Sequence, residues 1–140
     1  MEVSNTTKAI SGVILITVPT IEFGGAFLLR MLQTSQPGYV DNPLRQNLFR
    51  AGHAHAGVLV ILSLICQLFI DALETSADTA FPLLRVCVPA AAILMPLGFF
   101  LSVASPAAPK PNGWIALVYA GALFLAIGTL WLGVLLVVRS

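Results

Sequence analysis

Four long apolar runs, separated by short polar stretches, dominate the sequence. They predict helices over residues 9–32, 48–70, 83–105 and 114–138. Each run has roughly the 20 apolar residues that a helix needs to cross the hydrocarbon core of a bilayer. We therefore predict an all-α integral membrane protein, with four transmembrane helices in an up-down bundle that forms one domain over residues 1–140.

Three polar connections separate the runs. Residues 33–47 contain the turn signals Pro37-Gly38 and Asn42-Pro43, residues 71–80 are acidic, and residues 105–113 are rich in proline. An even number of spans places both termini on one side of the membrane. The cations that flank the runs on that side are Lys8, Arg85 and Arg139, and those on the other side are Arg30, Arg45, Arg50 and Lys110. By the positive-inside rule, four against three favours a cytoplasmic location for the second side.

Composition supports a membrane protein and excludes several function classes. The chain is 58% hydrophobic and 9% charged, whereas roughly a quarter of the residues of a soluble domain are charged. Its net charge of +1 comes from scattered residues, so no basic surface for nucleic acid is expected. The sequence has no Ser-His-Asp set, phosphate-binding glycine loop or paired-carboxylate pattern, and it therefore assigns no catalytic residue. Cys66 and Cys87 are expected to be small buried hydrophobes, with metal ligation or a redox role as the alternative.

The last run carries two patterns of small residues. Gly121 and Gly128 lie two helical turns apart, and Ala122 and Ala126 form a small-xxx-small pair. Small side chains let helix backbones approach closely inside a membrane. Both patterns predict close packing against a neighbouring helix, in the same chain or in another subunit.

The two histidines, His53 and His55, lie in the first third of the second run, among glycine and alanine residues. Residues two apart on an α-helix point about 200° away from each other, so the two side chains cannot bind one ion together on a regular helix. Titratable groups inside the membrane are costly and usually functional. We therefore treat His53 and His55 as separate candidate ligands of a metal or cofactor. The small side chains around them leave a flat helix surface that suits a flat macrocycle or a closely packed partner.

Other polar residues extend this candidate site. Glu22 lies near mid-membrane in the first run, and Gln67 shares with His53 a polar stripe that is expected to face the bundle interior or an adjoining protein. Glu22 and a histidine would lie at similar depths in antiparallel helices. Three alternatives are open for Glu22 and the histidine: a purely structural pair, a pair that orients a ligand or transfers protons, and no contact. Arg45 and Arg50 could contact a lipid phosphate or a cofactor carboxylate, or anchor the helix at the interface.

The motifs in the first half of the chain resemble a known group. GGAFLLR at residues 24–30, followed by a loop and by RAGHAH at residues 50–55, is similar to small bacterial membrane proteins related to haem-copper oxidase subunit I. This resemblance covers Ile10 to Ile70. It implies a bacterial inner-membrane location and a haem-type ligand at His53 or His55. The chain lacks the further helices and histidines of the oxidases, so oxidase activity is not implied.

Three functional hypotheses follow. The first is a small haem- or metal-binding protein, with haem b as its cofactor, in electron transfer or associated with a respiratory-type complex. One chain has too few histidines for both axial ligands of a haem, which favours a homo-oligomer. The second is an accessory subunit of a larger membrane complex, and the third is a proton or small-solute pathway that uses Glu22 and the histidines.

Overall fold

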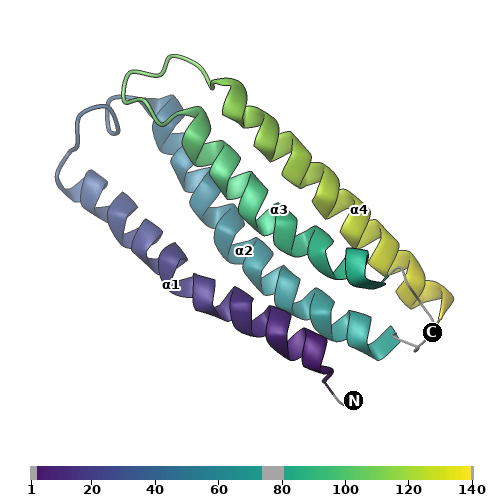
Figure 1. Cartoon of the computed structure of the whole chain (residues 1–140). Helices are drawn as coiled ribbons and strands as arrows, with labels where there is room; N and C mark the ends of the chain where they lie inside the picture. Colours follow the sequence, from purple (N-terminus) through teal and green to yellow (C-terminus); the bar gives the residue numbers. More distant parts are fainter. Residues whose placement is uncertain (1–2, 74–80, 140) are drawn as a thin grey trace.

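The structure is a computed structural model that describes residues 3–73 and 81–139, and it consists of helices (Figure 1). The helices are α1 (Asn5–Gln33), α2 (Pro43–Leu73), α3 (Phe81–Ser102), the 3-10 turn η1 (Gly113–Ile115) and α4 (Ala116–Val138). The four α-helices are long and apolar enough to cross a membrane. Successive helices run in opposite directions, with both chain ends at the same end of the bundle. The predicted all-α, up-down arrangement of four spans is confirmed. The acidic connection lies outside the described residues from position 74 onward.

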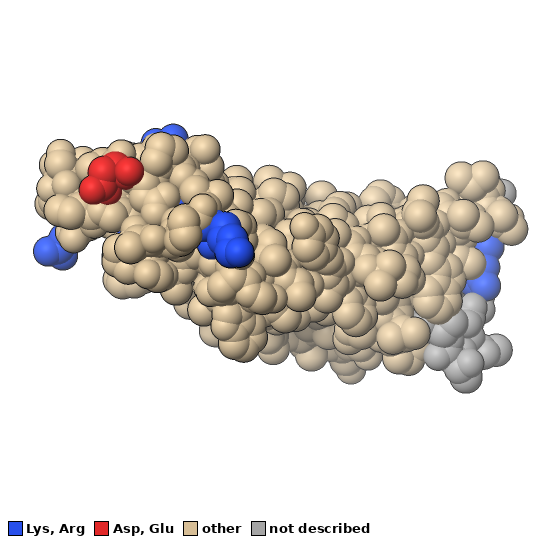
Figure 2. All heavy atoms as spheres, turned by 90° about the horizontal axis from the view of Figure 1, so that it is seen from above, with Lys and Arg blue, Asp and Glu red and all other residues tan. Residues whose placement is uncertain are grey.

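The outer surface of the bundle is apolar. Large hydrophobic side chains stand exposed along α1 and α4, for example Ile16 at 77% and Val137 at 76%. On the face drawn in Figure 2 a long stretch has no charged side chain; most charges lie toward the two ends, and one basic side chain lies further in. An exposed apolar surface of this extent is typical of a protein in contact with lipid. The chain is a small four-helix integral membrane protein.

The second helix begins five residues earlier than predicted, at Pro43 rather than at position 48. Asn42 caps this helix, because its side-chain oxygen accepts a hydrogen bond from the Arg45 backbone N–H at 3.1 Å. Proline is favoured at the first helical position, where its missing N–H costs nothing. The Asn42-Pro43 pair is thus a helix start rather than part of a loop, and the connection shortens to residues 34–42.

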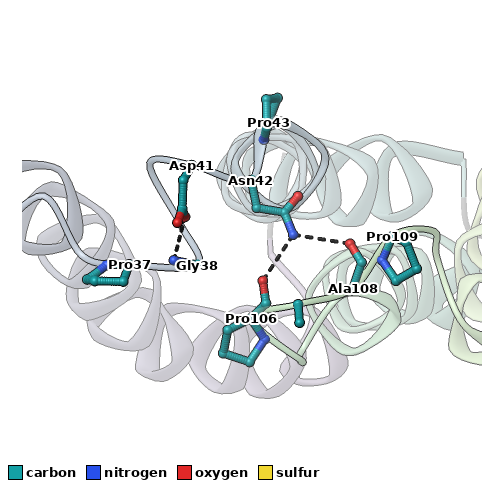
Figure 3. A pocket seen from close by; sticks show the side chains of 9 residues that line it. Pro37, Gly38, Asp41, Asn42, Pro43, Pro106, Ala108 and Pro109 are labelled. Atoms are coloured by element: carbon teal, nitrogen blue, oxygen red, sulfur yellow. Dashed lines mark hydrogen bonds between the residues drawn. The ribbon is translucent and has the colours of Figure 1, made fainter.

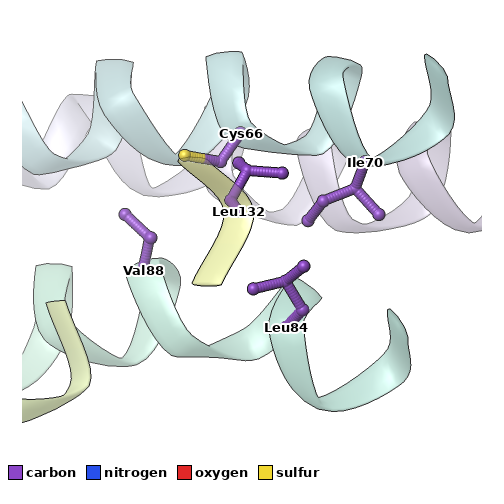
Figure 4. Packing of buried hydrophobic residues seen from close by; sticks show 5 residues of the cluster. All are labelled: Cys66, Ile70, Leu84, Val88 and Leu132. Atoms are coloured by element: carbon purple, nitrogen blue, oxygen red, sulfur yellow. The ribbon is translucent and has the colours of Figure 1, made fainter. Parts of the chain in front are cut away.

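Helices α2, α3 and α4 form the tightly packed part of the bundle. A core cluster brings together Cys66 and Ile70 of α2, Leu84 and Val88 of α3, and Leu132 of α4 (Figure 4). Both cysteines are buried and free, as the sequence predicted. Burial of such side chains is the main favourable contribution of a packed core.

The glycines of α4 allow this helix to approach α3 closely. A Cβ added at Gly121 would lie 2.5 Å from Cγ of Met95, and one at Gly128 would lie 2.7 Å from Cβ of Cys87. The predicted close packing is therefore confirmed for the glycine pair, and its partner is α3 of the same chain. Ala122 is exposed and takes no part in this contact.

Helix α1 stands apart from the other three. It packs on α2, whereas α3 packs on both α2 and α4. The middle of α1 is therefore separated from α3 by an open cleft along α2. A polar network holds the start of α1, and a buried cluster of Leu28, Met31, Tyr39, Phe49 and Val103 holds its other end.

Candidate functional site

The cleft between α1, α2 and α3 has a volume of about 620 Å³ and mostly apolar walls. Its polar members are His53 and three hydroxyl residues. Each hydroxyl donates to a carbonyl oxygen of its own helix: Thr17 to Ile14 at 2.6 Å, Thr20 to Thr17 at 2.6 Å and Ser63 to Leu59 at 2.7 Å. Because these hydroxyls have already donated their protons, the imidazole of His53 is the group in this cleft lining that can donate to a ligand or ligate a metal.

His53 points from α2 toward the glycine pair of α1. A Cβ added at Gly25 would lie 3.1 Å from both Cε1 and Nε2 of the imidazole, and one at Gly24 would lie 3.7 Å from Nδ1. Glycine at these two positions makes room for the ring between the helices. The imidazole is half-buried, and it has no hydrogen-bond partner within residues 3–73 and 81–139. The ring therefore keeps its donor and acceptor capacity at the cleft wall.

His55 points elsewhere, as the helical spacing predicted. Its Nδ1 lies 2.7 Å from the carbonyl oxygen of Ala51, and its ring centroid lies 5.1 Å from that of Phe99 on α3. If Nδ1 carries the proton and donates to this carbonyl, Nε2 has the free lone pair. His55 is not among the residues that line the cleft. Both histidines face protein because α2 lies between α1 and α3.

Glu22 is exposed on α1 and has no hydrogen bond or ion pair with any described residue. A direct hydrogen bond or ion pair between Glu22 and a histidine is therefore not formed among the described residues. The physical reason is the helix repeat: Ile14, Ile21 and Leu28 mark the inward face at intervals of seven, and the residue after Ile21 is turned about 100° away from that face. Arg50 is also exposed and does not line the cleft.

No group of three or more His, Cys, Asp or Glu side chains that could hold a metal ion occurs in the described part of the chain. A metal centre built by protein ligands alone is thus not formed by these residues within one chain. The two histidines remain separate candidate ligands, as the sequence predicted.

A polar network that we did not predict joins three helices at the end of the bundle where the termini lie. It consists of Ser4, Thr7, Gln67, Asp71 and Arg85. Nη2 of Arg85 lies 2.5 Å from Oδ1 of Asp71, and both side chains are at most 3% exposed. Nη1 of Arg85 donates to Oγ1 of Thr7 at 2.6 Å and to Oε1 of Gln67 at 3.1 Å.

Asp71 holds the start of α1 in this network. Its carboxylate accepts hydrogen bonds from the backbone N–H of Ser4, the hydroxyl of Ser4 and the hydroxyl of Thr7, each at 2.8 Å. Gln67 is fully buried and donates to the carbonyl oxygen of Arg85 at 2.7 Å. Gln67 therefore faces the bundle interior, as its stripe suggested, but its partner is an arginine rather than a cofactor.

Arg85 was not predicted to belong to a site. It was counted above among the cations that flank the membrane helices. It is 2% exposed and paired, so it is no free membrane anchor. Without it, two flanking cations remain on the terminal side, Lys8 and Arg139, against four on the other. The ion pair could have been predicted from the sequence, because Asp71 and Arg85 have opposite charges and lie at adjoining ends of consecutive antiparallel helices.

No protein-family model matches the chain, no curated protein matches its sequence, and no solved structure matches its fold. The resemblance to proteins related to haem-copper oxidase subunit I therefore stays a prediction.

Proposed function

We propose that the protein binds a hydrophobic redox cofactor in the cleft between α1, α2 and α3, with His53 as the polar contact. The observation that supports this is the imidazole at the cleft wall, which has no hydrogen-bond partner among the described residues. An unpaired imidazole within a membrane span is costly unless a ligand meets it. The cleft volume of about 620 Å³ lies within the usual range of small-molecule sites.

Haem b is the first candidate for this cofactor. The wall beside His53 includes Gly24, Ala56 and Ala92, whose small side chains suit a flat macrocycle. The fit has one condition: the Cε1–Nε2 edge of the imidazole lies against Gly25, so the ring must turn toward the cleft to ligate iron. When bound, haem supplies one-electron redox chemistry and the protein supplies the ligand and the apolar surroundings.

A haem held by two histidines would need a second one from elsewhere, because His55 lies outside the cleft. The same histidine of a second copy of the chain is the simplest source, so the haem proposal includes a homo-oligomer. A quinone is the alternative cofactor. It would need one hydrogen bond from the imidazole to a ring carbonyl, and no second copy.

The test is the absorbance spectrum of the protein purified in mild detergent, followed by organic extraction and mass spectrometry. Wild type should show a Soret band, or release a quinone, in near-stoichiometric amount. His53→Ala should lose the cofactor, whereas the matched variant His55→Ala should retain it, because only His53 lines the cleft. Equal retention by both variants, or absence of any cofactor from the wild type, would refute the proposal.

A second candidate function is an accessory subunit of a larger membrane complex, and the exposure of Glu22 favours it. A carboxylate that faces lipid is unfavourable, so a partner helix that donates a hydrogen bond or a positive charge would stabilise it. The particle size of the protein extracted from its native membrane tests this function. Glu22→Gln should release a smaller particle, and Ile16→Ala, also exposed on α1 but outside the cleft, should not.

The third hypothesis, a proton or solute pathway, requires a link between Glu22 and the histidines. Within the described residues Glu22 has no hydrogen bond to either. We do not propose that function.

A further inference from the structure

The loops at the histidine end of the bundle are held together by two side chains. The side-chain amide of Asn42 donates to the carbonyl oxygens of Pro106 at 3.0 Å and Ala108 at 3.1 Å (Figure 3). Arg45 makes the second link. Its Nε donates a hydrogen bond to the carbonyl oxygen of Val103 at 3.1 Å, and its Nη1 donates one to the carbonyl oxygen of Gly38 at 3.0 Å. Residues 34–42 and the segment after α3 therefore form one fixed surface.

The guanidinium of Arg45 is fixed in this surface but keeps free donors. A third bond runs from Nη2 to the Ala104 carbonyl at 3.4 Å, and the group lies 4.6 Å from the ring centroid of Phe49. A guanidinium has five N–H donors, so the three bonds to carbonyls leave two N–H groups without an acceptor among residues 3–73 and 81–139. None of the three acceptors is a carboxylate, and the positive charge is therefore not neutralised by an ion pair among the described residues.

Arg45 lines a hollow of about 410 Å³ together with a second cation, Arg30. Arg30 is exposed in the last turn of α1 and has no hydrogen bond or ion pair from its side chain to a described residue. Asp41, a nearby carboxylate in the sequence, accepts a hydrogen bond from the Gly38 N–H and lines the neighbouring hollow instead (Figure 3). Two arginines thus share one hollow that contains no acidic side chain.

The same hollow is apolar on the side of the bilayer. Phe27 of α1 lines it and is 45% exposed, one turn nearer to mid-membrane than Arg30. A site with two guanidinium groups at the membrane surface and an aromatic ring below them matches a phospholipid, whose phosphate lies above its acyl chains. Arginine binds phosphate through charge-assisted, often bidentate hydrogen bonds.

We propose that this hollow binds the phosphate of an anionic phospholipid, with Arg45 as the fixed ligand, Arg30 as the mobile one, and an acyl chain beside Phe27. The site is separate from the cleft that contains His53, and it does not depend on the cofactor proposed there. A lipid bound here bridges the end of α1 to α2 and to the segment after α3.

The test is native mass spectrometry of the full chain released from nanodiscs with equal amounts of phosphatidylglycerol and phosphatidylcholine. Wild type should retain phosphatidylglycerol preferentially. A cation near an anionic lipid surface contributes about 1 kcal/mol, or about a fivefold change in retention. Arg30→Gln and Arg45→Gln should each lower the preference by about fivefold. Arg50→Gln should leave it unchanged, because Arg50 is exposed but lies outside the hollow.

Each other outcome overturns the proposal. An equal loss in Arg50→Gln would mean diffuse attraction to the membrane rather than a site. Unchanged preference in Arg30→Gln would mean that the hollow does not bind the phosphate. Displacement of the lipid by excess inorganic phosphate would show a phosphate site that does not need a lipid. If circular dichroism shows that Arg45→Gln has lost helix, the lipid preference of Arg30→Gln alone tests the proposal. The Arg30 side chain makes no hydrogen bond to the described residues, so this substitution should leave the fold intact.

Discussion

Replacing Arg85 by glutamine should destabilise the bundle by about 3 kcal/mol. The change removes the ion pair to Asp71 and the hydrogen bonds to Thr7 and Gln67. Hydrogen bonds between membrane helices contribute only about 0.6 kcal/mol each on average. A buried charge left without its partner costs about 3–5 kcal/mol, so the cost is dominated by the carboxylate of Asp71.

The lower end of that range is expected for two structural reasons. Asp71 would keep its three donors from Ser4 and Thr7, and it lies only two residues before the end of α2 at Leu73. A cost of about 3 kcal/mol is more than a hundredfold change in the unfolding equilibrium. Wild type and variant should therefore separate clearly in one titration.

The assay is unfolding by a denaturing detergent in mixed micelles, followed by far-ultraviolet circular dichroism. Arg50→Gln is the matched control, and its exposed side chain predicts a change within about 0.5 kcal/mol. The double variant Asp71→Asn with Arg85→Gln removes both charges and should recover more than half of the loss. The reasoning is refuted if Arg85→Gln is as stable as Arg50→Gln, or if the two single costs simply add in the double variant.

Three further substitutions test the packing, the loop surface and the histidine. Gly128→Leu should cost about 1–3 kcal/mol in the same titration by overpacking against α3, whereas Gly133→Ala, with nothing within 4 Å of its added Cβ, should be neutral. Asn42→Ala removes a helix cap and two loop bonds and should cost about 1–2 kcal/mol, with the exposed Asn47→Ala as its control. Gly25→Ala should retain the cofactor in the absorbance assay with little loss of stability, because its added methyl displaces the half-buried imidazole away from α1 and toward the cleft; loss of the cofactor would contradict the site.

The fold was predictable because its signals are local and strong. Hydrophobic runs of membrane length depend only on composition, and Gly121 and Gly128 share one helix face by their spacing alone. The early start of α2 at Pro43 was missed because Asn-Pro is compatible with both a turn and a capped helix start. Only the hydrogen bond from the Arg45 N–H to the Asn42 side chain distinguishes the two.

The candidate site was predictable only in part. The helix repeat correctly separated His53 from His55, but it contained no information on which helix each would face. Glu22 attracted attention as a charged residue inside a span, yet it faces outward. Arg85 of α3, by contrast, is buried because two other helices, α1 and α2, supply acceptors to it. Such a network is a property of tertiary contacts, which the order of residues in one helix does not specify.

The polar network also has a consequence for biosynthesis. Its carboxylate, Asp71, belongs to the second helix to be synthesised, and its cation, Arg85, belongs to the third. Until α3 has entered the membrane, the carboxylate has no guanidinium, and α1 is held at its start by hydroxyl and amide donors alone. Insertion of the third helix therefore completes the attachment of the first, so a chain arrested after α2 would carry the carboxylate of Asp71 without its ion pair.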